Sequence, residues 1–343
     1  MSHAQNRSEI VGPGIRMQLL QMGSAYLLSR ALHVAAELGI ADLLIDKDKT
    51  AADLAQATNC NEDALYRLLR MLASNNVFAE DAEGRFTLTP LANALRSDIE
   101  GSLRDAIRMV DDLWWDAYGR LAYTVKTGKP AFEEVTGVLE FAYHDQHPEV
   151  NERFIRGMAN FGNHENHTIV EAYDFSSFNS IVDVGGGRGD LIAEILRANP
   201  VTRGVLYDRA DVVSQMKCKD TEDIADRCHF VAGDFFTSVP AGADAYLLKR
   251  IIHDWDDNRS EIILRNCRKG MNSGGRILVI DAVLSPGNTW HPGKSTDLLM
   301  MTLLGGRERT AEEFASVFHK AGFNLKRVIA TRSTLSIVEG VAN

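Results

Sequence analysis

The sequence predicts an α/β protein, with a doubly wound, mainly parallel sheet in the C-terminal half and a smaller, mainly helical domain before it. From residue 180 onward, short apolar runs alternate with helical patterns, as in parallel sheets covered by helices on both faces. Before that point a helix, a turn, a second helix and a hairpin follow one another, which is the order of a winged helix. A chain of 343 residues is long enough for both parts.

The first predicted element is a helix over residues 10–40 with a weak point at Gly23. Apolar residues such as Leu19, Leu27 and Leu38 recur there at helical intervals. They cover more of the circumference than one core requires, which fits a helix buried between its own domain and a partner chain. An internal core helix is the alternative at this point.

The winged-helix pattern follows over residues 42–100. Thr50 is a good N-cap for its first helix. Its predicted elements are the helices 51–57 and 62–75 and the strands 77–79 and 85–88. Winged helices often bind DNA, but residues 41–100 contain six basic and eleven acidic side chains, a net charge of −5. A dimerisation or scaffold role is therefore favoured over DNA binding.

Residues 103–175 are predicted to be mostly helical, with breaks at 128–130 and 147–148. The expected domains are 1–100 (dimerisation), 101–175 (helical, lining a substrate pocket) and 176–343 (cofactor-binding and catalytic). The predicted strands cover residues 180–184, 203–207, 228–232, 243–248, 276–280, 325–330 and 335–339. The last two are too close for a helix between them and are expected to pair antiparallel at one edge.

Composition excludes several classes of partner. The chain has 37 basic and 47 acidic residues, a net charge of −10, which disfavours nucleic acid and anionic membranes. No uncharged run is long and apolar enough to span a bilayer. Four cysteines without a C-x-x-C pair are typical of reduced thiols. A cytoplasmic protein is expected.

A glycine turn at Gly185, Gly187 and Gly189 follows the first strand of the sheet and opens a helix. Doubly wound folds bind ligands at this place. Asp183 and Asp190 flank the turn, which suits a ligand with ammonium and sulfonium charges better than a pyrophosphate. The pattern thus favours S-adenosylmethionine (SAM) over NAD, although Asp190 also suits the dipole of its own helix.

Further acidic and aromatic residues stand at the ends of the next strands. Asp208 lies 19 residues after Gly189, the distance expected for a carboxylate that binds ribose hydroxyls. Asp234 and Phe235, after the third strand, offer a carboxylate and an aromatic face to an adenine ring.

The catalytic candidate is His253, after the fourth strand. A neutral imidazole can take the proton of a phenol when a carboxylate stabilises the imidazolium. Three carboxylates are candidates for that role, and the sequence does not choose among them: Asp254, Asp281 and Glu308. Asp254 alternatively caps the next helix, and Thr310 with Glu313 forms a capping box after Glu308.

Together these motifs resemble the SAM-dependent O-methyltransferases of the plant caffeate and bacterial natural-product type, over nearly the whole chain. The segments that resemble them are Asp183–Gly189, Asp208, Gly233–Phe236, Leu248–Trp255 and Gly305–Thr310. The resemblance implies a Rossmann-like catalytic domain and an intertwined homodimer through the N-terminal winged helix. Arg250, in place of the plant tryptophan, is typical of the bacterial branch.

The resemblance also implies roles. His253 is the general base, oriented by Asp281 and Glu308; Asp281 is one methylene shorter than the plant glutamate. The implied cofactor contacts are Gly185, Gly187, Asp208, Asp234, Phe235 and Lys249. The implied reaction is direct methyl transfer to a phenolic hydroxyl of an aromatic natural product in secondary metabolism, such as antibiotic biosynthesis, leaving S-adenosylhomocysteine (SAH).

A substrate pocket is expected between the long helix before the sheet and the helix before Glu308. Its predicted lining residues are Met158, Phe161, His164, Asp254, Met300, Met301 and Leu304, with plain core packing as the alternative for the helical ones. Two H-x-x-H pairs, His144/His147 and His164/His167, lack a third ligand, so no metal is predicted. A SAM-binding hydroxylase or decarboxylase and a non-enzymatic DNA-binding regulator are the alternative functions.

Overall fold

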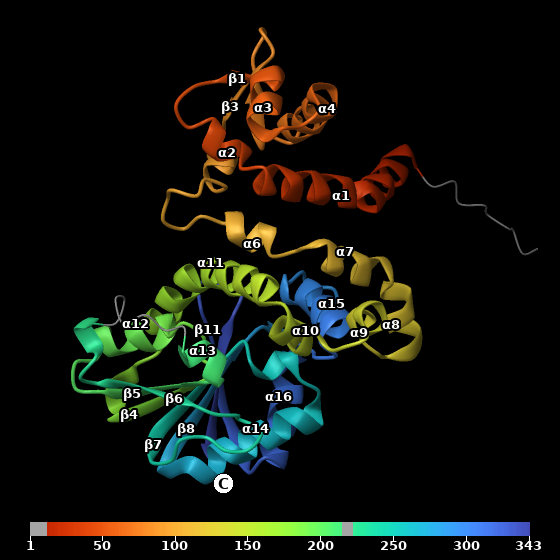
Figure 1. Cartoon of the computed structure of the whole chain (residues 1–343). Helices are drawn as coiled ribbons and strands as arrows, with labels where there is room; N and C mark the ends of the chain where they lie inside the picture. Colours follow the sequence, from red (N-terminus) through yellow and green to blue (C-terminus); the bar gives the residue numbers. More distant parts are fainter. Residues whose placement is uncertain (1–11, 215–221) are drawn as a thin grey trace, which may run out of the picture. The chain divides into compact units, whose positions relative to one another are not determined.

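A computed structural model describes residues 12–214 and 222–343 of the chain (Figure 1). The chain divides into two compact units, the first ending at Arg108 and the second beginning at Met109. Residues 101–175, predicted as one helical region, are divided between these units. Across the described residues, no helix is both long and apolar enough to cross a membrane.

The first unit contains the predicted helix, turn, helix and wing. Its elements are α1 (Pro13–Glu37), α2 (Ile40–Leu43), β1 (Lys49–Thr50), α3 (Ala51–Thr58), α4 (Glu62–Ala73), β2 (Phe78–Glu80), β3 (Arg85–Leu88), α5 (Pro90–Asn93) and α6 (Arg104–Arg108). The hairpin β2–β3 is confirmed, and β1 adds a third antiparallel strand beside β3. The weak point predicted at Gly23 does not interrupt α1, because one glycine costs a helix only about 1 kcal/mol.

Helix α1 has two halves with different surroundings. Towards its end, Ala31 and Ala35 are buried in the core of the first unit. Nearer its start, Leu19, Leu20 and Tyr26 are 60–70% exposed. The interpretation as an internal core helix is therefore wrong for the first half of α1, whose apolar side chains are uncovered within this chain.

Helix α3 begins as predicted at Thr50, which forms a complete capping box. Its hydroxyl accepts a hydrogen bond from the Asp53 amide at 3.2 Å, and the Asp53 carboxylate accepts one from the Thr50 amide at 3.1 Å. Both bonds satisfy amides that would otherwise lack partners at the helix start.

Replacing Thr50 by alanine is expected to lower the free energy of unfolding by about 1 kcal/mol, because the first-turn amide loses its acceptor. Denaturant unfolding, followed by circular dichroism, measures this change. Thr50→Ser keeps the hydroxyl and is expected to match the wild type. Equal stability of the alanine and serine variants would contradict the capping role.

The second unit begins with helices that precede the sheet. They are α7 (Asp112–Gly119), α8 (Leu121–Thr127), α9 (Ala131–Thr136), α10 (Glu140–Gln146) and α11 (Pro148–Ala172), followed by the short 3₁₀ helix η1 (Phe175–Ser177). The predicted breaks near residues 128–130 and 147–148 are confirmed. An apolar cluster around Trp114 and Phe132 joins α7, α9 and α15.

The predicted sheet is confirmed and has seven strands in the order β11-β12-β8-β7-β4-β5-β6. Its elements are β4 (Ser180–Val184), α12 (Asp190–Ala198), β5 (Arg203–Asp208), α13 (Ala210–Ser214), η3 (Glu222–Ile224), β6 (Cys228–Ala232), β7 (Ala243–Lys249), η4 (Ile252–Asp254), α14 (Asp257–Gly270), β8 (Met271–Asp281), β9 (Val283–Leu284), α15 (Gly293–Leu303), β10 (Arg309–Thr310), α16 (Ala311–Lys320), β11 (Phe323–Ala330) and β12 (Ser336–Ala342). The last two strands pair antiparallel, and β12 lies between β11 and β8.

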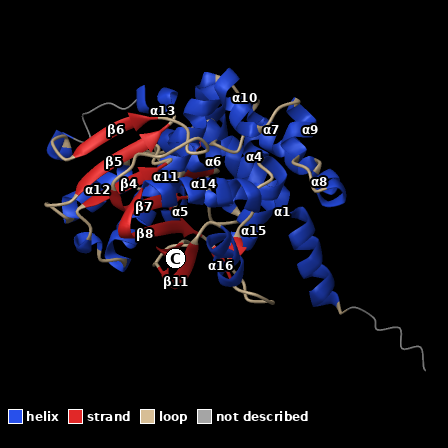
Figure 2. Ribbon diagram, turned by 90° about the horizontal axis from the view of Figure 1, so that it is seen from below, coloured by secondary structure: helices blue, strands red, loops and turns tan. Residues whose placement is uncertain are grey.

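Side chains alternate between two cores, one on each face of this sheet. Figure 2 shows the strands of the sheet in red and the helices in blue. Ile181 and Leu247 point to the core under α11 and α12, whereas Val182 and Leu248 point to the core under α14 and α16. Burial on both faces explains the continuous apolar runs of the strands. The carboxyl ends of β4, β5, β7 and β8 consequently lie along one edge, where loops are free to form a site.

Candidate active site

The glycine turn after β4 has a backbone that only glycine adopts easily. Gly185, Gly187 and Gly189 have φ angles of 70°, 57° and 78°. At Gly186 a Cβ would overlap Leu206 and the carboxylate of Asp183, so the chain passes close over that side chain. At Gly187 a Cβ would meet open space, which leaves the outer side of the turn accessible to a ligand.

Beneath the turn, Asp183 is 1% exposed and one of its carboxylate oxygens, Oδ2, has no hydrogen-bond partner among the described residues. Burial raises the pKa of Asp183 to about 7, although the nearby Lys249 ammonium acts in the opposite direction. A buried carboxylate that lacks a donor is suited to receive one from a ligand.

Asp208, at the end of β5, reaches the same turn. Its Oδ2 accepts a hydrogen bond from the Gly187 amide at 2.8 Å, and its Oδ1 accepts one from the Arg209 amide at 2.7 Å. Burial raises its pKa. Each oxygen keeps a further lone pair for a ligand hydroxyl.

An aromatic cluster stands beyond β6. Phe235 lies there as predicted, and the exposed Asp234 accepts the Phe236 amide at 2.9 Å. Trp255, which the sequence analysis did not select, contacts both phenylalanines, with its ring centre 4.8 Å from that of Phe236 and 6.2 Å from that of Phe235. Its indole nitrogen is buried without a partner among the described residues. In the sequence, its position two residues after His253 could have indicated that Trp255 belongs to the site.

Lys249 and Arg250, at the end of β7, bind helix α11. The Lys249 ammonium donates to Asn166 Oδ1 at 2.7 Å and lies 3.1 Å from Glu165, which also pairs with the Arg250 guanidinium. Although burial raises the pKa of Glu165, these two cations hold it below its ordinary value. Arg250 has a left-handed backbone with φ of 54°, uncommon for a side chain of this size. Lys249 therefore lies between Asp183 and α11.

His253, in η4, is 4% exposed and has a carboxylate at each ring nitrogen. Its Nδ1 lies 2.8 Å from Glu308 Oε1, and its Nε2 lies 3.3 Å from Asp254 Oδ1. Asp281, fully buried at the end of β8, acts on the imidazole through its charge. Asp254 does not cap the next helix, since Asp256 accepts the Arg259 amide there.

These carboxylates change the electrostatics expected for His253. Burial alone would lower its pKa, but Asp254, Asp281 and Glu308 together raise it to about 9. The pKa of His253 is therefore above that of an ordinary imidazole, so in the ligand-free site the ring is mostly protonated at pH 7. Burial also raises the pKa of Asp254 to about 7 and that of Asp281 to about 6.

Glu308 is held beside His253 by its backbone neighbours. At Gly306 a Cβ would overlap the backbone of His253 and Asp254, and the Arg307 amide donates to the His253 carbonyl at 2.8 Å. The pairing of β10 with β9 joins this segment to the end of β8. Thr310 and Glu313 form the predicted capping box of α16.

Arg309 is a further positioning residue, missed by the sequence analysis. Its fully buried guanidinium donates to the carbonyls of Ile252 and Trp255, at 3.0 and 2.9 Å, and to Asp257 at 2.9 Å. It thereby joins the turn that contains His253 to the segment that contains Glu308.

The comparisons with known proteins agree with this arrangement. A family model of an O-methyltransferase domain matches residues 118–324, and one of an O-methyltransferase dimerisation domain matches residues 20–98. The chain belongs to the O-methyltransferase family.

This O-methyltransferase is 43% identical over 322 residues to the phenazine O-methyltransferase PhzM of Lysobacter antibioticus, with 94% of each chain covered. The solved structure of LaPhzM superposes with a TM-score of 0.91 at 42% identity, covering 96% of this chain and 99% of that one. CalO1, a methyltransferase of calicheamicin biosynthesis solved with SAH bound, gives a TM-score of 0.85 at 40% identity, covering 98% and 100%. The comparisons do not favour the hydroxylase or regulator alternatives.

The residues predicted to line the substrate pocket of the O-methyltransferase lie on two helices that share an apolar cluster. On α11, Met158 packs partly buried in that cluster, and Phe161 is 40% exposed. On α15, Met300 is buried, and Leu304 after the helix packs in the same cluster. Met301 is half-buried. The side chain of His164 lies outside the described residues. The lining role remains a prediction.

In the H-x-x-H pairs of the O-methyltransferase, His147 and His167 contact protein groups. His147 Nδ1 lies 2.9 Å from the Tyr143 carbonyl, and His167 lies 3.2 Å from Glu194 and 3.3 Å from Glu171. The described residues contain no group of three or more His, Cys, Asp or Glu arranged to hold a metal ion.

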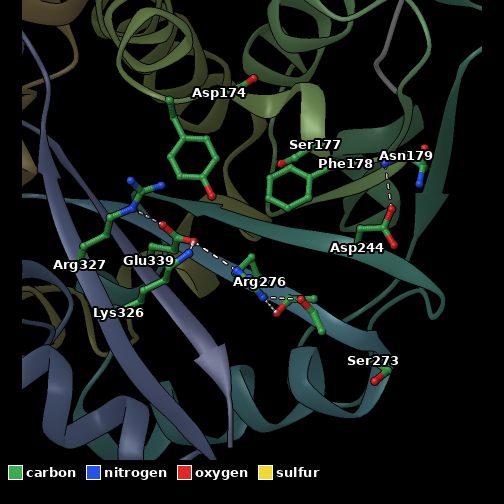
Figure 3. Close-up of a pocket in the computed structure, with 13 residues that line it drawn as sticks. Asp174, Ser177, Phe178, Asn179, Asp244, Ser273, Arg276, Lys326, Arg327 and Glu339 are labelled. Carbon is green, nitrogen blue, oxygen red and sulfur yellow. Dashed lines mark hydrogen bonds and ion pairs between the residues drawn. The ribbon is translucent and has the colours of Figure 1, made fainter.

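A hollow lies at the opposite, amino-terminal ends of β4 and β7 (Figure 3). Its most buried charged group is Glu339, 1% exposed, which pairs with Arg276, Lys326 and Arg327. Burial raises the pKa of Glu339, yet Arg327 and Lys326 hold it below its ordinary value. Its charges thus satisfy one another, and we assign the hollow no role in methyl transfer.

Proposed function

We propose that this enzyme transfers the methyl group of SAM to a phenolic hydroxyl of an aromatic natural product, with His253 as the general base. One observation supports the base most directly, the 2.8 Å contact between His253 Nδ1 and Glu308. It leaves Nε2 as the nitrogen that can accept a proton. The names of relatives that act on phenazine and mitomycin compounds support the substrate class.

The residues of the glycine turn fit SAM. The unpartnered Oδ2 of Asp183 provides an acceptor for an ammonium group, and Asp208 provides acceptors for ribose hydroxyls. Gly185 and Gly187 allow the backbone to approach closely. Asp234, Phe235 and Lys249 complete the proposed binding residues. When bound, SAM supplies a sulfonium-activated methyl group.

The catalytic residues prepare the phenol. His253 accepts the hydroxyl proton at Nε2, and Glu308 stabilises the resulting imidazolium through Nδ1. Asp281 stabilises the imidazolium by its negative charge alone, because neither of its oxygens has a hydrogen-bond partner among the described residues. Asp254, beside Nε2, lies where the substrate hydroxyl must approach. Burial of His253 and Glu308 excludes water, which strengthens these interactions.

Titration with SAH, with NAD as the control, tests the cofactor, and incubation with SAM and a panel of phenols tests the reaction by mass spectrometry. We expect binding of SAH alone and a product that gains one methyl group per SAH formed. A product that gains oxygen or loses carbon dioxide, or binding of NAD alone, would overturn the proposal.

The raised pKa of His253 predicts the pH dependence. Because the base must be deprotonated, kcat/KM for the phenol should rise with pH through neutrality, reach half of its maximum at about pH 9 rather than about pH 7, and level off only above that. Asp254→Asn removes one of the carboxylates that raise this pKa and should move the rise to lower pH. Rate profiles of both enzymes provide the measurement. A wild-type profile already level at neutral pH would contradict it.

We also propose that the protein forms a homodimer through its dimerisation domain and the first half of α1. The family match supports a dimer, and the apolar side chains of α1 are exposed to solvent in the single chain. Leu19→Glu combined with Leu20→Glu should shift the protein towards a monomer in sedimentation velocity. Ile262→Glu, at an exposed apolar residue of the second unit, is the control. A dimer unchanged by the α1 substitutions would contradict this assignment.

A further inference from the structure

A buried acid–base pair on α10 has no part in the mechanism above. Glu140 and His144 are 2% and 3% exposed and lie one helical turn apart on the same face. Glu140 Oε1 and His144 Nε2 are 3.9 Å apart, too far for a direct hydrogen bond.

Both side chains lack a hydrogen-bond partner at one atom. Among the described residues, none bonds to Glu140 Oε1 or to His144 Nδ1. The indole of Trp114 satisfies only part of the Glu140 carboxyl. Buried polar atoms are nearly always paired, because an unpaired one forfeits its hydration without compensation. Two such atoms on one helical face indicate that a ligand completes them.

The pair lies next to the catalytic turn. The ring of Phe141, adjacent to Glu140, is 5.8 Å from that of Trp255, and the ring of His144 is 4.9 Å from that of Phe154 on α11. Glu140 is also near enough to Asp254 for the two carboxyl groups to interact electrostatically. A substrate whose hydroxyl is at His253 is therefore the nearest ligand of the right kind.

The charges around the pair limit what it can bind. Burial raises the pKa of Glu140 to about 8, with Asp254 and Asp111 adding to the rise, so the group is protonated at neutral pH and can donate. Burial lowers the pKa of His144 to about 4, so this imidazole is neutral. The nearby cation Arg209 is already paired with Asp145 and Asp211. A carboxylate on the substrate would meet Asp254 and Asp111, the two carboxylates that act on Glu140, although Arg153 on α11 lies near enough to Asp111 to act on it.

We propose that Glu140 and His144 form a specificity subsite that donates a hydrogen bond to a ring nitrogen of a heteroaromatic phenol. This inference rests on the proposed function and adds the substrate class. The protonated carboxyl group of Glu140 donates to the ring nitrogen, and the imidazole of His144 supplies a second polar contact.

The test compares two phenols of the same shape, a hydroxyphenazine and the corresponding hydroxyanthracene, in which CH replaces each ring nitrogen. We expect the wild-type enzyme to favour the phenazine in kcat/KM by about tenfold, the usual value of one buried hydrogen bond. Glu140→Leu should bring the ratio near one. Glu140→Gln, whose amide donates a weaker hydrogen bond than a carboxylic acid, should fall between. His144→Phe should also lower the ratio.

Glu149→Leu, at an exposed carboxylate on α11, is the matched control and should leave the ratio unchanged. A wild-type ratio near one, or a ratio that Glu140→Gln and His144→Phe leave unchanged, would overturn the inference. A purely structural role would lower kcat/KM for both phenols equally and leave their ratio intact. Failure of the proposed function looks different, since neither phenol would then be methylated.

Discussion

His253→Ala is expected to lower kcat for methyl transfer by about a thousandfold, within the range that a positioned general base contributes. The imidazole is held by Glu308 at Nδ1, and Arg309 fixes the backbone of its turn. Without it, the phenol must lose its proton to water in a site built to exclude water. Single-turnover rates at saturating SAM measure the loss.

The affinity for SAH should change little in this variant, because His253 lies outside the glycine turn and its ring nitrogens contact Glu308 and Asp254. His319→Gln, at an exposed histidine of α16, is the control for a general effect of losing a histidine. Retention of more than about a tenth of the wild-type rate would show that another group, with Asp254 the first candidate, accepts the proton.

Glu308→Gln tests whether Glu308 acts on His253 by orienting the ring or by its negative charge. The amide keeps the shape of the side chain but removes the charge that stabilises an imidazolium, so a loss smaller than that of His253→Ala is expected. The apparent pKa should fall as well, since one of the three carboxylates that raise it is gone. A positioning role thus predicts a shifted pH profile together with a lower rate.

The sheet could be predicted from the sequence because its strands are local signals. Runs such as 180–184 and 243–249 are mostly apolar, since both faces of the sheet are covered. The glycine turn is local too, because it requires left-handed backbone at Gly185 and Gly187 within a few residues of β4. Neighbours in the chain decide both features.

The catalytic details could not be predicted in this way, because they depend on residues that are far apart in the chain. His253 and Glu308 are 55 residues apart, and they are brought together by the pairing of β9 with β10 and by the hydrogen bonds of Arg307 and Arg309 to the turn that contains His253. The sequence therefore left three carboxylates open. The raised pKa of His253 is the combined effect of all three, which no single motif contains. Arg309 was missed because an arginine beside a motif gives no sign of burial.

The surroundings of α1 were ambiguous for a related reason. Apolar residues around most of a helix indicate that it is covered, but not whether its own chain or another covers it. The structure divides the helix, with Ala31 and Ala35 in the core of the first unit and Leu19 and Leu20 outside it.

Asp208→Ala is expected to weaken SAH binding by about a hundredfold, since two hydrogen bonds to a charged carboxylate contribute about 1.5–3 kcal/mol each and are not fully additive. The carboxylate has two tasks. It accepts the Gly187 amide at 2.8 Å, which fixes the glycine turn, and in the proposed function its remaining lone pairs accept the ribose hydroxyls. Calorimetric titration with SAH measures the loss.

Asp208→Asn separates these tasks, because its carbonyl oxygen can still accept the Gly187 amide while the charge is lost. We expect an affinity between those of the wild type and the alanine variant. Asp226→Asn, at an exposed carboxylate in the same half of the sheet, is the control. If Asp208→Ala binds SAH as tightly as this control does, the glycine turn holds the nucleoside without the end of β5, and the role proposed for Asp208 is wrong.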